Sequence, residues 1–121
     1  MAEEKKDLRN THTFKLELSI PSGDFSGTFT MHRPTIAERI QIGTKEAREL
    51  EGLANIDFFT SNLAHMVAVF DVLLDDKPTW FVPRELHDVE VLQAVYAKYV
   101  DFLNEFLERP KPQGNSTEPS K

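Results

Sequence analysis

The sequence predicts an α+β protein, mainly α-helical, in which an N-terminal β-hairpin packs on about three helices. Three observations support this fold class. Apolar and polar residues alternate along two segments near the N-terminus, apolar residues recur every three or four positions along three later segments, and every aromatic residue lies between Phe14 and Phe106. Alternation is typical of a strand with one buried face, and the longer spacing is typical of a helix. The aromatic residues mark the part of the chain that can build a core.

Composition divides the 121 residues into one domain and two tails. A single globular domain is expected over residues 12–109, because residues 1–11 and 110–121 contain almost no large apolar side chains. The C-terminal segment, PKPQGNSTEPSK, is also rich in proline. Neither segment can bury enough apolar surface to offset the entropy lost on ordering. Both tails are therefore expected to be disordered.

The hairpin is expected over residues 13–32. Its first strand is indicated by alternation along residues 14–20 and its second by alternation along residues 25–32, and the residues between them, PSGD, favour a turn. A hairpin by itself is only marginally stable in water. Its apolar face therefore needs helices or another subunit to cover it.

The first helix is expected over residues 35–51. It begins with a predicted capping box, in which the side chains of Thr35 and Glu38 bind each other's backbone amides. Its apolar residues recur at spacings of four and three and are expected to face the core, while the opposite face is charged. This predicted inward line consists of Ile36, Ile40, Gly43, Ala47 and Leu50.

Two further helices are expected, over residues 57–75 and residues 85–109. The second helix is apolar on most sides, which is typical of a helix in the middle of a core. The third carries a heptad-like line of apolar residues. Val91, Val95 and Phe102 lie beside that line and widen the apolar stripe beyond what two helices in a monomer usually need.

Six residues are candidates for binding a partner protein. Trp80 and Phe81 lie in a connector flanked by prolines, where two large rings are either a lid on the core or anchors for a partner. The other candidates are expected to form an exposed apolar surface, which in a small acidic protein indicates association. They are Phe58, Val91, Val95 and Phe102. We therefore also expect a homo-oligomer.

Charge and hydropathy argue against two classes of partner. Twenty acidic and fourteen basic residues give a net charge of -6, which argues against binding nucleic acid phosphates. The longest apolar stretch, residues 63–74, is too short to span a bilayer and is interrupted by His65 and Asp71. The first residues carry no apolar signal sequence. A cytoplasmic protein with no membrane partner is expected.

Catalysis and cofactor binding find little support in the residues. Ser61 and His65 lie four positions apart on one expected helix, but no orienting acid accompanies them. His87, Asp88 and Glu90 lie at a helix N-terminus, where acidic residues favour the helix dipole without any metal. The chain has no cysteine, and its glycines form no nucleotide-binding motif. We therefore predict a protein that is not an enzyme and holds no metal or cofactor.

One segment resembles a known family. Residues 27–43, GTFTMHRPTIAERIQIG, are similar to the corresponding stretch of small tail assembly chaperones of long-tailed bacteriophages. Three later features agree in order: an apolar second helix, a Pro-x-Trp-aromatic turn at residues 78–81, and a Val-Tyr pair in the last helix. The resemblance covers roughly residues 14–107.

The resemblance implies a non-enzymatic role in phage tail assembly. Such a chaperone keeps the long, helical tape measure protein soluble and brings tail tube subunits to it in the cytoplasm of the infected host cell. No catalytic or cofactor residue is implied. Two alternatives remain open: a small structural tail protein, such as a completion or minor tail subunit retained in the virion, and a small enzyme.

Overall fold

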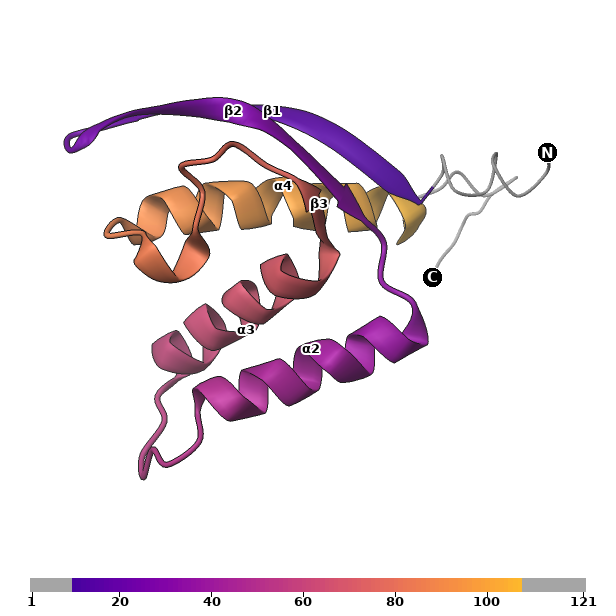
Figure 1. Cartoon of the computed structure of the whole chain (residues 1–121), viewed down its shortest axis with the longest axis vertical. Helices are drawn as coiled ribbons and strands as arrows, with labels where there is room; N and C mark the ends of the chain where they lie inside the picture. Colours follow the sequence, from indigo (N-terminus) through magenta and orange to yellow (C-terminus); the bar gives the residue numbers. More distant parts are fainter. Residues whose placement is uncertain (1–9, 108–121) are drawn as a thin grey trace, which may run out of the picture.

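The computed structural model describes residues 10–107, which form a three-stranded antiparallel sheet and three α-helices (Figure 1). The predicted α+β class, a hairpin on three helices, is confirmed. The predicted tails and the end of the last predicted helix, at residues 108–109, lie largely outside the described residues. The strands are β1 (Thr11–Ile20), β2 (Gly23–His32) and β3 (Leu74–Asp76), and the helices are α2 (Ile36–Glu49), α3 (Phe58–Leu73) and α4 (Val89–Leu107).

The hairpin forms because each strand has one apolar and one polar face. Its register runs from Thr11 opposite His32 to Ile20 opposite Gly23. Gly23 has φ of +152°, a conformation that residues with side chains rarely adopt, so glycine suits this turn. The short strand β3, which the sequence did not predict, extends the sheet by pairing with the last residues of β2.

The elements are stacked in the order sheet, α4, α3 and α2. Figure 1 shows the hairpin curving over α4, with α3 beneath α4 and α2 on the far side of α3. The core lies between the sheet, α3 and α4. Phe81 is fully buried at its centre, with ring centroids 5.0 Å from Phe29 on β2 and 5.3 Å from Phe70 on α3.

Four of the six predicted partner-binding residues are core residues. Phe81, Val91 and Val95 have no exposed surface, and Phe102 is 4% exposed. The expectation that Val91, Val95 and Phe102 lie at an exposed apolar surface is therefore wrong, whereas the burial of Phe81 fits a lid on the core. The hairpin covers the second face of α4, and His12 of β1 stacks on Phe102 with centroids 5.0 Å apart. The wide apolar stripe of α4 faces two neighbours, the sheet and α3.

Trp80 is half-buried and ties the connector to the hairpin. Its indole Nε1 donates a hydrogen bond to the Ser26 carbonyl at 3.0 Å, and its ring packs against Phe25. Pro78 of the same connector lies so close to Gly27 on β2 that a Cβ at Gly27 would overlap its ring. The connector therefore covers the core, which is the lid interpretation of Trp80 and Phe81.

Candidate partner-binding surface

Helix α2 begins as the sequence predicts but faces the other way. Thr35 Oγ1 accepts a hydrogen bond from the Glu38 amide at 3.1 Å, and Glu38 Oε1 accepts one from the Thr35 amide at 3.0 Å. However, Ile36 is 78% exposed and Ile40 is 66% exposed, whereas Ile42 is buried. The expectation that the line from Ile36 through Ala47 faces the core is therefore wrong.

Polar contacts explain this orientation of α2. Glu46 Oε1 lies 3.0 Å from Nδ1 of His65 on α3. Arg84 lies in a short 3-10 helix, Pro83–Glu85. Its Nε donates a hydrogen bond to Glu49 of α2 at 2.8 Å, and a terminal nitrogen donates one to Asp71 of α3 at 2.9 Å. Hydrogen bonds to Asp71 and Glu49 raise the pKa of Arg84. The side of α2 that carries Ile42 and Glu46 thus faces the rest of the molecule, and the apolar stripe faces solvent.

Most exposed large apolar residues of the described chain lie along α2, the loop that follows it, and the first turn of α3, and one, Val82, lies in the connector before the Pro83–Glu85 helix. We call this set the α2 apolar surface. It consists of Ile36, Ile40, Leu53, Ile56, Phe58, Phe59 and Val82. The exposed Gly43 and Ala47 continue the stripe along α2 toward the loop. A patch of this kind is typical of a protein-binding site, because single exposed apolar residues are common but groups of them are not.

The start of α3 presents two phenylalanine rings to solvent. Asp57 caps the helix, with Oδ1 accepting a hydrogen bond from the Thr60 amide at 2.8 Å. Hydrogen bonds from Thr60 lower the pKa of this carboxyl, which is therefore ionised at neutral pH. The cap fixes the first turn of α3, where Phe58 is 80% exposed and Phe59 is 53% exposed. Phe58 is thus the one sequence-predicted candidate that lies mostly in solvent.

A shallow hollow adjoins this surface. It has a volume of about 200 Å³ and opens between α3, the Pro83–Glu85 helix and α4, with Leu63, Val67 and Leu92 among its lining residues. Phe59 lies one turn before Leu63 on α3. The hollow therefore offers a place for an apolar side chain of a partner next to the exposed phenylalanines.

Comparisons with known proteins assign this chain to no family. No protein-family model, curated protein or solved structure matches it. Within residues 10–107, no helix is both long enough and apolar enough to cross a membrane.

Two residues considered from the sequence for catalysis or metal binding have other partners in the structure. His65 bonds to Glu46, and Asp88 accepts a hydrogen bond from Ser22 of the hairpin turn at 2.7 Å. Among the residues that the structure describes, no cluster of three or more His, Asp and Glu side chains is arranged to hold a metal ion.

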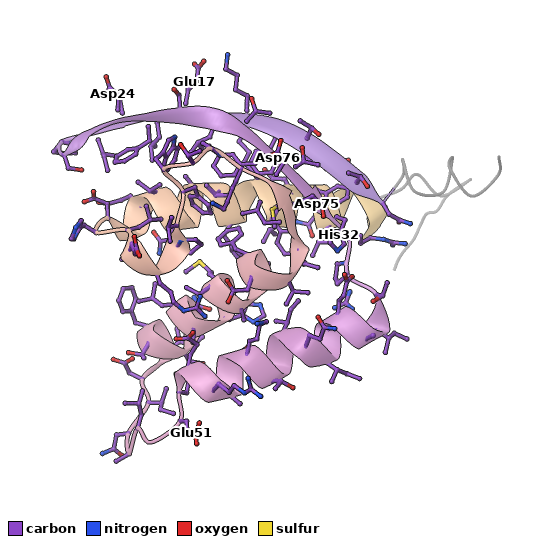
Figure 2. The ribbon with its side chains drawn as sticks, viewed as in Figure 1. Glu17, Asp24, His32, Glu51, Asp75 and Asp76 are labelled. Carbon is purple, nitrogen blue, oxygen red and sulfur yellow. The ribbon has the colours of Figure 1, made fainter. Side chains whose placement is uncertain are left out.

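Sequence reasoning missed one cluster of titratable groups, which is centred on His32. Its Nε2 lies 2.7 Å from Glu38 Oε2, and its Nδ1 lies 3.0 Å from both carboxylate oxygens of Asp75. Figure 2 shows His32 and Asp75 side by side, where β2 ends and β3 begins. Burial lowers the pKa of His32, but the hydrogen bonds and charges of Glu38 and Asp75 together outweigh it, so the pKa is raised. The cluster joins β2, β3 and α2.

The His32 cluster predicts a stability that falls as the pH rises. Because the folded-state pKa of His32 is above its ordinary value, its stabilisation is fully present at pH 5.5 and is lost as the pH rises through the raised pKa. Between pH 5.5 and pH 8.5, the free energy of unfolding measured with urea should fall by about 0.5–1 kcal/mol more in the wild-type protein than in the His32→Gln variant. Asp75→Asn should give an intermediate loss. Equal losses in the wild-type protein and His32→Gln would contradict the role of this cluster.

Proposed function

We propose that this protein is a non-enzymatic tail assembly chaperone of a long-tailed bacteriophage. In this proposal it acts in the host cell cytoplasm, binds the tape measure protein and helps recruit tail tube subunits. The observation that supports it most is the α2 apolar surface. The segment that resembles tail assembly chaperones, residues 27–43, contains Ile36, Ile40 and Gly43, which form the first half of the exposed stripe of α2.

The stripe on α2 has the spacing that suits a helical partner. Ile36, Ile40 and Gly43 are followed by Ala47 at steps of four, three and four residues, so they lie along one side of the helix. The small side chains of Gly43 and Ala47 let a second backbone approach closely, and nothing lies within 4 Å of a Cβ placed at Gly43. A partner helix with an apolar face would bury this stripe.

Two acidic residues flank the loop part of the α2 apolar surface and favour solubility. Figure 2 shows Glu51 in the loop after α2, at the end of the molecule remote from the sheet. Glu51 and the ionised Asp57 flank Leu53 and Ile56 in sequence. A binding surface with an apolar centre and a polar rim associates with one partner without general aggregation. This arrangement suits a protein that must itself stay dissolved while it holds an aggregation-prone chain.

Co-expression with the tape measure protein of the same phage tests the proposal. We expect the tape measure protein to move from the insoluble to the soluble fraction and to elute with this chain in size-exclusion chromatography. A co-expressed unrelated acidic protein of similar size is the control. If the tape measure protein were equally insoluble with and without this chain, and no complex eluted, the proposal would fail.

A small structural tail protein, such as a completion or minor tail subunit, is the second candidate, because a permanent neighbour in the virion would bury the same surface. Mass spectrometry of purified virions separates the two functions. An assembly chaperone is expected to be absent from finished particles, whereas a structural subunit would be present in fixed copy number.

A further inference from the structure

Strand β1 forms one edge of the sheet. The strand order is β1-β2-β3, so β2 has a neighbour on each side and β1 has a neighbour on one side. In the part of the chain that the structure describes, no strand pairs with the outer edge of β1. This edge is ten residues long, and its exposed polar side chains alternate with buried or half-buried ones. Such an edge is a template for pairing with another strand.

The hairpin register shows which backbone groups face this edge. The Arg33 amide donates a hydrogen bond to the Asn10 carbonyl at 2.7 Å, which fixes the pair at the base of the hairpin. In antiparallel strands, hydrogen-bonded and non-hydrogen-bonded pairs alternate. The N–H and C=O groups of Thr13, Lys15, Glu17 and Ser19 therefore point away from β2, toward the outer edge.

The polar face of β1 carries two opposite charges near its middle. Lys15 Nζ lies 3.4 Å from Glu17 Oε2, and their side chains are 69% and 73% exposed. Figure 2 shows Glu17 pointing away from the helices. These two charges flank Leu16, which is buried on the opposite face of the strand.

We propose that a second copy of this chain pairs through its own β1 with this edge, antiparallel, about a two-fold axis at Leu16. Lys15 then lies opposite the partner subunit's Glu17, and Glu17 lies opposite the partner subunit's Lys15. The Lys15–Glu17 ion pair within each chain and the two Lys15–Glu17 pairs between the chains then form a square of alternating charge on the outer face of the sheet. On the inner face, Leu16 meets its counterpart, and the apolar faces of the two sheets become continuous.

Charge and side-chain direction select this register over its neighbours. A shift of two residues in pairing would place Lys15 opposite Lys15, or Glu17 opposite Glu17, and like charges in directly opposed positions are destabilising. A shift of one residue would place buried side chains opposite exposed ones, which breaks the continuity of both faces. The pairing uses neither α2 nor the α2 apolar surface. It is therefore independent of the proposed chaperone function.

Charge-reversal variants test the pairing, with sedimentation equilibrium from about 1 to 200 μM as the measurement. Lys15→Glu places like charges opposite each other in both halves of the interface, and so does Glu17→Lys. Each is expected to weaken self-association at least about tenfold. The double variant, Lys15→Glu with Glu17→Lys, restores the alternation and is expected to associate within about threefold of the wild-type protein. A mixture of the two single variants should form mixed dimers.

The double variant and the mixture are the controls for folding, because both carry the same substitutions as the weakened proteins. Far-UV circular dichroism should be unchanged in all variants, since both side chains are mostly exposed. A wild-type protein that is monomeric over the whole concentration range would overturn the proposal. Self-association that is equal in the wild-type protein and both single variants would place the interface elsewhere and would also overturn it.

Discussion

Replacing Phe81 with alanine is expected to lower the free energy of unfolding by about 3–5 kcal/mol. The Phe81 side chain is completely buried, and it contacts rings from three different elements. Its centroid lies 5.0 Å from Phe29 on β2, 5.3 Å from Phe70 on α3 and 5.8 Å from Trp80 in the connector. The truncation would leave a cavity where the sheet, the connector and α3 meet. Urea unfolding followed by circular dichroism measures this loss.

Phe58→Ala is the matched control, since it is the same truncation at an exposed position. Phe58 is 80% exposed, so its loss should change the free energy of unfolding by no more than about 0.5 kcal/mol. From the sequence, Phe58 was expected at an exposed apolar surface, and Phe81 was either a lid on the core or an anchor for a partner. A large loss for Phe58→Ala would mean that Phe58 packs in the folded monomer, which would remove it from the α2 apolar surface.

The second large effect concerns binding and not stability. Replacing both Ile40 and Phe58 with serine is expected to weaken binding of the tape measure protein about a hundredfold, because truncating a central interface residue costs about 1–2 kcal/mol and the two lie at separate points of the surface. The folded monomer should lose little stability, since both side chains are mostly exposed. The dissociation constant, measured by isothermal titration calorimetry, checks this result.

Local chemistry made much of the fold predictable. The capping box of Thr35 and Glu38 and the turn before Gly23 depend on residues close in sequence, and the structure contains both. The helices begin and end within about four residues of their expected bounds, apart from the last end, which falls outside the described residues. Strand β3 was missed because only three residues form it and its partner, the end of β2, lies more than forty positions earlier.

The candidate surface was less predictable, because tertiary contacts decide which face of α2 is buried. The charged residues of α2 look like a solvated face in the sequence. In the structure, Glu46 bonds to His65 nineteen positions away, and Glu49 bonds to Arg84 thirty-five positions away. No local signal indicates those partners. Similarly, Phe102 looked surplus on α4 because its ring partner, His12 of the hairpin, lies ninety positions earlier in the chain.

The α2 apolar surface is the proposed binding site for the tape measure protein. The most direct test compares dissociation constants for the wild-type protein, the Ile40→Ser, Phe58→Ser double variant, and a control with two exposed residues of α4, Gln93 and Lys98, both replaced by serine. We expect the surface variant to bind about a hundredfold more weakly than the wild-type protein and the control to change by less than about twofold. Wild-type affinity in the surface variant, or an equal loss in the control, would contradict this expectation.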